Sequence, residues 1–252
     1  MVKKRIIPIQ LVKGRRLVKS HQFENFRDVG DPFSISKIYT AQDADELFLL
    51  RVGSKEESDD AYFFDLIKRI SNNCFIPLCA GGWIYSETQI NKLFQNGVDK
   101  ILFNSTFFSN NKLVRETISK YGSQSVVVGI DVKLIGSSYV IFANHGRLKT
   151  NINLKEYINA INKFNIGEIY VQNIDYDGTM SGYDNKLIKL VSSMTNIPVI
   201  AGAGAGGYPD MKSAFDHGAS AVAAGSLFNF GDNKPNSAKS FLANYGFKFR
   251  RK

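Results

Sequence analysis

Residues 76–105, IPLCAGGWIYSETQINKLFQNGVDKILFNS, align without a gap with residues 197–226, IPVIAGAGAGGYPDMKSAFDHGASAVAAGS. The two segments share an Ile-Pro start, an Ala-Gly pair four residues later and a final serine. Internal similarity at a constant offset is typical of a duplicated structural unit. We therefore divide the chain into two related halves, about residues 1–120 and 121–252.

Short apolar runs rich in Val, Ile and Phe recur through both halves, and amphipathic segments separate most of them. This alternation is typical of a parallel sheet, and about 250 residues suffice to close one into a barrel. Asp31 and Pro32 mark the start of the first helix, as N-cap and first helical residue. We predict one α/β domain over residues 1–252, a (β/α)8 TIM barrel with twofold internal (βα)4 pseudosymmetry. Its predicted strands are Arg5–Leu11, Glu46–Val52, Phe75–Ala80, Lys100–Asn104, Ser125–Asp131, Glu168–Asn173, Ile197–Gly202 and Ala219–Gly225.

The charge and composition narrow the class of partner. The chain carries a net charge of +9, but its Lys and Arg residues are scattered, apart from a cluster within residues 248–252. This pattern favours phosphorylated small molecules over nucleic acid. The first apolar run is too short for a signal peptide or a membrane span, so we expect a cytoplasmic location. Cys74 and Cys79 have no second Cys or His pair, and we expect reduced core residues, with no metal and no cofactor.

Glycine-rich turns follow the third and seventh predicted strands, at the barrel end where active sites of this fold are built. Glycines let backbone N–H groups approach a phosphate closely, although tight turns alone also use them. Because the turns recur in register in both halves, we predict two phosphate cradles and an elongated substrate with one phosphate at each end. The predicted cradle residues are Gly82, Asn104, Ser105, Thr106, Gly202, Gly204, Gly225 and Ser226.

Acidic residues follow the fifth and sixth predicted strands. Asp131 ends the fifth strand, where a carboxylate can act as general acid or base, and loop capping is its structural alternative. Asp177 and Gly178 belong to a polar loop near the second cradle, and we predict that they contact the substrate. An alternative role for the acidic groups of this loop is to orient the loop itself.

The three histidines are not paired with a nucleophile in the sequence. We expect His21 to be solvated in the first loop and His217 to cap a helix end. For His145, which lies beyond the fifth strand, substrate contact is the less favoured interpretation.

These residues resemble the HisF family over essentially the whole chain. The family uses ammonia that a HisH glutaminase releases from glutamine, passes it along the barrel axis, and consumes it in a lyase and cyclisation reaction. The acceptor is a bis-phosphorylated ribulosyl intermediate, and the family forms the cyclase subunit of imidazole glycerol phosphate synthase in histidine biosynthesis. The resemblance is carried by Lys4-Arg5-Ile6-Ile7, Asn25-Phe26-Arg27-Asp28, Gly30-Asp31-Pro32, and, most specifically, by Asp177-Gly178-Thr179 and Ser181-Gly182-Tyr183-Asp184.

The resemblance also assigns residues to an ammonia gate and to partner and substrate contacts. A salt-bridge ring that closes the barrel floor for stability is the alternative interpretation of the gate. Asp99 matches a position at the interface with the glutaminase, and Lys19 matches a first-loop lysine that contacts substrate. The implied gate consists of Arg5, Glu46, Lys100 and Glu168.

Three positions depart from the family pattern. The family's catalytic pair is one Asp at the end of strand one and one at the end of strand five, and only Asp131 remains, because Leu11 occupies the first position. A leucine cannot transfer a proton. Arg51 replaces an Asp at the end of strand two, and Trp83 replaces a glycine in the first phosphate turn. The second half-site is therefore intact, and the first is remodelled.

Three functions fit these observations. Our leading hypothesis is a HisF-like paralogue that keeps the HisH-like glutaminase and the ammonia route but serves another acceptor. Such paralogues occur with a sugar amidotransferase in surface-polysaccharide pathways, where ammonia becomes an acetamidino group. The alternatives are a genuine imidazole glycerol phosphate synthase cyclase and an inert barrel that only docks and activates the glutaminase.

Overall fold

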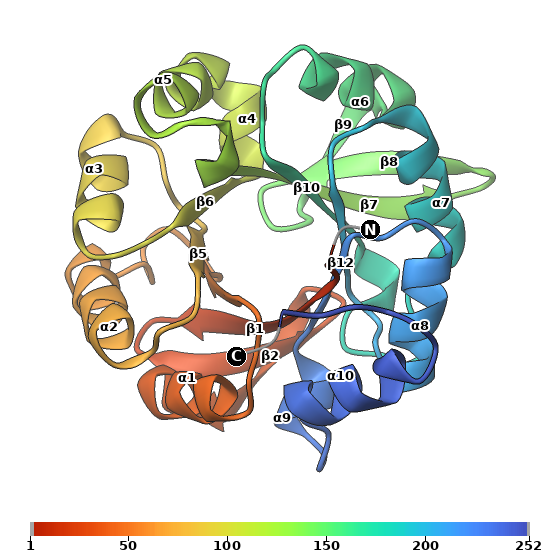
Figure 1. The fold of residues 1–252 in the computed structure, drawn as a ribbon. Coiled ribbons are helices and arrows are strands. Elements are labelled where there is room, and N and C mark those ends of the chain that lie inside the picture. The colour runs from red at the N-terminus through yellow and green to blue at the C-terminus, as the bar shows by residue number, and fades with distance from the viewer. Residues whose placement is uncertain (1–2, 251–252) are drawn as a thin grey trace.

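Eight parallel strands close into a barrel in the computed structural model, which describes residues 3–250 (Figure 1). The strand order is β1-β4-β5-β6-β7-β10-β11-β12, and β12 pairs with β1 to complete the circle. This closed parallel sheet confirms the predicted (β/α)8 barrel. The barrel strands are β1 (Arg5–Lys13), β4 (Leu47–Arg51), β5 (Leu78–Gly81), β6 (Lys100–Phe103), β7 (Val126–Ile135), β10 (Glu168–Asn173), β11 (Val199–Gly202) and β12 (Ala221–Ala224).

The helices form a ring outside the barrel (Figure 1). The first begins as predicted, because the Asp31 side chain accepts a hydrogen bond from Ser34 N at 2.7 Å and Pro32 is the first helical residue. None of the described helices is long and apolar enough to cross a membrane. The helices are α1 (Pro32–Ala41), α2 (Asp60–Asn73), α3 (Glu87–Gln95), α4 (Ser105–Ser109), α5 (Asn111–Tyr121), α6 (Leu154–Asn162), α7 (Asn185–Met194), α8 (Tyr208–Asp216), α9 (Ser226–Asn229) and α10 (Pro235–Ala243), with short 3-10 turns η1 (Ser123–Ser125) and η2 (Ile174–Tyr176).

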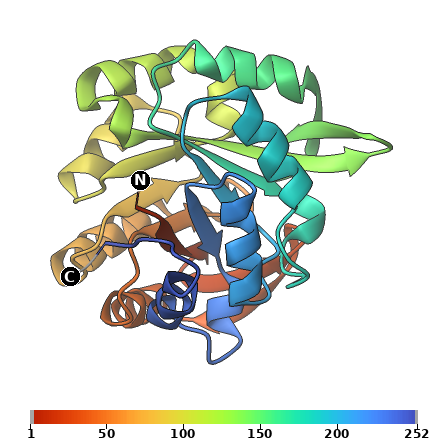
Figure 2. The same ribbon diagram turned by 45° about the vertical axis from the view of Figure 1, so that its right-hand side comes forward.

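Two antiparallel hairpins extend the barrel beyond the predicted strand ends. Strand β1 continues past Leu11 to pair with β2 (Arg16–His21), which pairs with β3 (Glu24–Gly30). Strand β7 continues past Asp131 to pair with β8 (Ser138–Ala143) and then β9 (Leu148–Asn153). Figure 2 shows the green β7–β8 hairpin projecting from the barrel. These strands were not predicted because antiparallel pairing within each hairpin, and not burial in the barrel, defines them.

The barrel interior and the space between barrel and helices are both filled with apolar side chains. Cys74 and Cys79 are free and buried, as predicted. Three strands begin two or three residues later than predicted. Phe75 is 88% exposed, and β5 begins three residues later, after Pro77. Strands β11 and β12 each begin two residues later than predicted, at Val199 and Ala221. Of the predicted basic cluster within residues 248–252, Arg251 and Lys252 lie outside the described residues.

Candidate functional site

The amino ends of the barrel strands, called the floor here, carry a ring of two cations and two anions. Arg5 contacts Glu46 at 2.5 Å and also bonds Glu168. Lys100 lies 3.0 Å from Glu46 and 2.7 Å from Glu168. Charges therefore alternate around the axis, and every charge has two partners. The four residues that the resemblance assigned to a gate meet in one place.

Burial sets the electrostatics of the floor ring. The Glu46 side chain is only 1% exposed, and this burial raises the pKa of its carboxyl, against the opposing effects of Lys100 and Arg5. Removing one member of such a buried cluster leaves an uncompensated charge, which is strongly destabilising. The ring is therefore both a polar closure of the barrel and a structural element.

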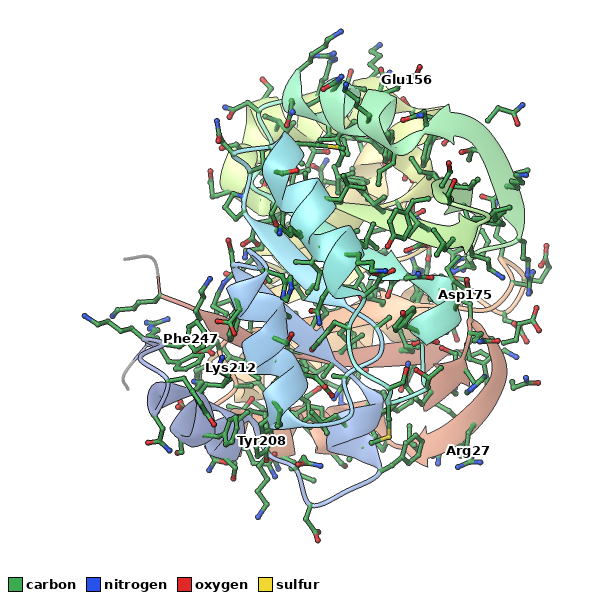
Figure 3. The ribbon with its side chains drawn as sticks, turned by 90° about the vertical axis from the view of Figure 1, so that its right-hand side faces the viewer. Arg27, Glu156, Asp175, Tyr208, Lys212 and Phe247 are labelled. Atoms are coloured by element: carbon green, nitrogen blue, oxygen red, sulfur yellow. The ribbon has the colours of Figure 1, made fainter. Side chains whose placement is uncertain are left out.

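The carboxyl ends of the strands, called the rim, surround a pocket at the opposite end of the barrel. Figure 3 shows the molecule from the side, with Arg27 and Asp175 at the rim end and Phe247 at the opposite end. Gly202 does not line the pocket; it packs below, where an added Cβ would come within 2.3 Å of the Tyr170 hydroxyl. The other predicted site residues all line it: Lys19, Gly82, Asn104, Ser105, Thr106, Asp131, Asp177, Gly178, Gly204, Gly225 and Ser226.

Asp131 is held by two amide donors from neighbouring strands. Gln172 Nε2 donates to its Oδ1 at 2.8 Å, and Asn104 Nδ2 donates to its Oδ2 at 2.9 Å. The Tyr170 hydroxyl donates to Gln172 Oε1 at 2.7 Å and so fixes the amide. Burial raises the pKa of Asp131 to about 6, although both amides oppose the shift. A carboxyl with this pKa can exchange a proton near neutral pH.

The position equivalent to Asp131 in the first half is apolar. In the sheet register, Asp131 lies beside Gln172 on the β7–β10 pair, and Leu11 lies beside Leu50 on the β1–β4 pair. Both leucines are half-buried and pack against the barrel interior. The carboxylate and the amide that holds it are therefore both missing from the first half of the rim.

Asp177 ties the first hairpin to the loop after β10. Lys19 and Asp177 form a buried ion pair at 2.6 Å, and Ser20 Oγ donates to the same carboxylate at 2.6 Å. Gly178 brings this loop so close that an added Cβ would lie 2.4 Å from Ser20 O. Asp177 thus orients the loop in this structure, and its partner Lys19 faces the pocket.

The second predicted cradle has an unused hydroxyl. Ser226 Oγ is buried in the pocket wall and has no hydrogen-bond partner among residues 3–250. Gly204 has a φ of +95°, and an added Cβ would lie 2.1 Å from Gly182 O, so only glycine fits there. A buried hydroxyl without a partner is costly unless a ligand satisfies it.

The first predicted cradle has its hydroxyls already engaged. Asn144 N donates to Ser105 Oγ at 2.8 Å, and Thr106 Oγ1 donates to Ile84 O at 2.7 Å. Trp83 follows Gly82 in the turn and lines the pocket. The two cradles therefore differ in the groups that they present to a ligand.

Comparison with known proteins agrees with this architecture. A family model described as "Histidine biosynthesis protein" matches residues 5–234. The imidazole glycerol phosphate synthase subunit HisF of Hyphomonas neptunium is 40% identical over 251 residues, which cover 99% of both chains. The corresponding subunit of Chloroherpeton thalassium is 37% identical over 99% of this chain and 100% of its own. This chain belongs to the HisF family.

Several pocket residues of this HisF-family chain had no role assigned from the sequence. Arg51 is 3% exposed, and its guanidinium donates to Gly82 O and to Trp83 O, both at 3.0 Å, and bonds Asp60. It thereby fixes the turn after β5. His145, for which substrate contact was the less favoured interpretation, lies in the pocket and contacts the Trp83 ring.

Two further inward residues could have been found from strand periodicity. Glu168, Tyr170 and Gln172 are alternate residues of β10, so their side chains point to the same side of the strand. Because Glu168 was assigned to the floor inside the barrel, the other two were predictable as inward-facing. The remaining histidines follow expectation, because His21 is exposed and His217 ends α8, with its Nδ1 2.7 Å from Ser213 O.

Asp99 lies at the floor, immediately before the ring residue Lys100. Its carboxylate accepts a hydrogen bond from Leu78 N at 2.8 Å, and its own N–H donates to Leu78 O. Asp99 is nevertheless exposed, so it can also contact a partner at this end of the barrel. Its role in this structure is to bind the start of β5.

Proposed function

We propose that this chain is the ammonia-using synthase subunit of a two-part glutamine amidotransferase of the imidazole glycerol phosphate synthase type. The observation that carries the proposal is the arrangement of a charged ring at the floor and a carboxylate pocket at the rim of one barrel. The relatives are themselves named as subunits of that synthase. A HisH-like glutaminase docked at the floor, near Asp99, would deliver ammonia to the ring.

The barrel interior is suited to uncharged ammonia. Between ring and pocket it is lined by apolar and aromatic side chains and a free thiol, including Ile7, Phe48, Cys79 and Tyr170. An ammonium ion would lose its hydration there without a counter-ion, whereas neutral ammonia loses much less. Ammonia that reaches the rim arrives beside Asp131, which can take up or release the proton that the addition requires.

The relatives favour one acceptor. Because they carry the name of the histidine-pathway enzyme, the bis-phosphorylated ribulosyl intermediate is the first candidate, and the reaction is then a lyase and cyclisation step. The names of these relatives give no support to the polysaccharide sugar acceptor that we placed first from the sequence. The genuine cyclase therefore becomes the leading assignment for the acceptor.

A specific observation supports a second candidate function, in which the acceptor differs. In this chain Leu11 takes the place of one carboxylate of the family's two-carboxylate scheme. Leu50, its neighbour in the sheet, takes the place of the amide that would hold that carboxylate. Trp83 additionally occupies the first phosphate turn. Both changes lie where the acceptor binds, so they favour a synthase whose acceptor has changed while its ammonia supply is retained.

Glutaminase stimulation tests the proposal. We expect the cognate HisH-like glutaminase to be more active with this barrel added, and a Lys100→Met variant to reduce ammonia transfer without preventing complex formation. Absence of both complex formation and stimulation would refute the proposed function. Stimulation without any conversion of an acceptor would instead identify an inert, activating barrel.

Complementation separates the two acceptors. Growth of a strain lacking the histidine-pathway cyclase, rescued by this chain, would establish the genuine cyclase. Failure to grow, with rescue by a matched Leu11→Asp and Leu50→Gln variant, would mean that the leucine pair has removed the ancestral reaction. An Asp131→Asn variant of the same chain serves as the negative control.

A further inference from the structure

We propose that the half-site around Trp83 receives an uncharged ring of the substrate in place of a second phosphate. The inference rests on the proposed function, and within it on the second candidate, a synthase whose acceptor differs from the bis-phosphorylated intermediate. The substrate class that follows is a monophosphate, held by its phosphate at Ser226 and by an uncharged ring at Trp83. The C–H face of a sugar ring and the flat face of a heterocycle both stack on an aromatic side chain.

The backbone of the first turn matches that of the second, and only the side chains differ. Gly82 and Trp83 have φ values of +83° and +55°, and the aligned residues Ala203 and Gly204 have +64° and +95°. A tryptophan at positive φ strains the backbone, because its Cβ crowds the chain in this conformation. The strain persists because Arg51 donates to both Gly82 O and Trp83 O. A bulky side chain is thus held where the fold would accept glycine.

The Trp83 ring and its neighbours form an aromatic wall on this side of the pocket. His145 packs against Trp83 with ring centroids 4.7 Å apart and planes inclined by 39°, and Tyr85 lies 6.0 Å from Trp83. Phe23 and Phe26 of the first hairpin line the same pocket. Aromatic faces of this kind stack on flat rings, and they offer nothing to a phosphate.

The polar groups of this half-site are poor phosphate ligands. The hydroxyls of Ser105 and Thr106 already bond the chain, whereas Ser226, aligned with Ser105, has no partner within the described part of the chain. Burial lowers the pKa of His145 to about 4, so its imidazole is neutral at physiological pH. Arg51 also lines the pocket, but its guanidinium is already bonded to Gly82 O, Trp83 O, Ser58 Oγ and Asp60.

One hydrogen-bond donor of the aromatic wall has no partner and is available to an uncharged acceptor atom of a ligand. The Trp83 Nε1–H is buried and has no hydrogen-bond partner in residues 3–250. Buried indole N–H groups usually have a partner, so a ring oxygen, hydroxyl or ring nitrogen of the ligand would satisfy it. A neutral ring that carries such an atom fits the wall in both shape and polarity.

Calorimetric titration of the full chain with four probes tests the inference. The probes are glycerol 3-phosphate, a hexose 1-phosphate, a nucleoside 5′-monophosphate and the open-chain form of a sugar bisphosphate. We expect one of the two ring monophosphates to bind roughly tenfold or more tightly than glycerol 3-phosphate, as ring stacking on an aromatic side chain provides. Which of the two binds more tightly identifies the ring.

Variants at Trp83 complete the test. Trp83→Gly, which relieves the backbone strain and therefore should fold, is expected to abolish the preference for a ring, and Trp83→Phe to retain most of it. An unchanged preference in Trp83→Gly, or tightest binding of the bisphosphate by the wild type, overturns the inference while the proposed function stands. If no probe binds and the glutaminase is not stimulated, the proposed function falls as well.

Discussion

The two half-barrels have similar turns at the rim but carry different side chains there. Asp131 lies beside Gln172 in the second half, where Leu11 lies beside Leu50 in the first. At the floor, Glu46 and Glu168 occupy equivalent strand starts and face the same two cations. Both cations come from the first half, because the positions aligned with Arg5 and Lys100 are Ser125 and Ala221. The halves therefore differ at both ends of the barrel, while each supplies one buried anion to the floor ring.

The largest effect is expected from Asp131, the buried carboxylate of the rim pocket that two amides hold. Asp131→Asn should lower ammonia-dependent conversion of the acceptor by about 10²- to 10⁴-fold, the usual contribution of a general acid or base. The matched control is Leu11→Asn at the equivalent position, which should change the rate far less. Turnover with external ammonium salt measures both, and equal losses from the two variants would contradict a functional asymmetry.

The two glutamates of the floor ring should contribute about equally to stability. Glu46→Gln and Glu168→Gln each leave two cations facing a single anion, and we expect each to lower the free energy of unfolding by about 3–5 kcal/mol. Urea denaturation measures both. The exposed pair Arg16 and Asp28 provides the control, because Arg16→Ala should cost less than about 1 kcal/mol. A fully tolerated Glu168→Gln would show that the two glutamates are not equivalent.

The pH dependence of stability isolates the burial of Asp131. Its pKa is about 6 in the folded chain and 3.8 ordinarily, so its neutral form favours folding, and that contribution is lost as the pH rises from about 4 to 6. Asp131→Asn should therefore be more stable than the wild type at pH 7, by about 3 kcal/mol, and nearly equal to it at pH 3.5. Thermal or urea unfolding across this range checks the sign. A difference independent of pH would mean that the carboxyl is hydrated.

The smallest expected effect compares the two aligned serines. Ser226→Ala should weaken the binding of inorganic phosphate by about tenfold, because a hydrogen bond to a charged group is lost. Ser105→Ala should change it by less than about twofold, since that hydroxyl donates its proton to Asn104 Oδ1 at 3.4 Å and also accepts from Asn144 N. Calorimetric titration measures both, and equal losses would mean that both cradles hold phosphate.

Much of the site was predictable because the duplication marks it. Aligning the halves brought out Gly82, Ser105, Gly204 and Ser226, and all four line one pocket. The barrel fold was predictable as well, because the apolar strand pattern recurs in both halves. Tyr170 and Gln172 lie on a predicted strand and were missed although strand periodicity places them inward. His145 lies in an unpredicted hairpin, whose position depends on how its strands pair.

The sequence by itself determined the barrel, its two related halves and the leucine at position 11 where the second half has Asp131, because these depend on residue identity and spacing along the chain. Only the tertiary structure decided which hydroxyls remain available. Ser105 and Ser226 are equivalent in sequence, yet one accepts a hydrogen bond from a turn 39 residues away and the other accepts none within the described chain. Hydrogen bonding is set by what packs against a group, and a buried donor or acceptor shows its use only when its neighbours are placed.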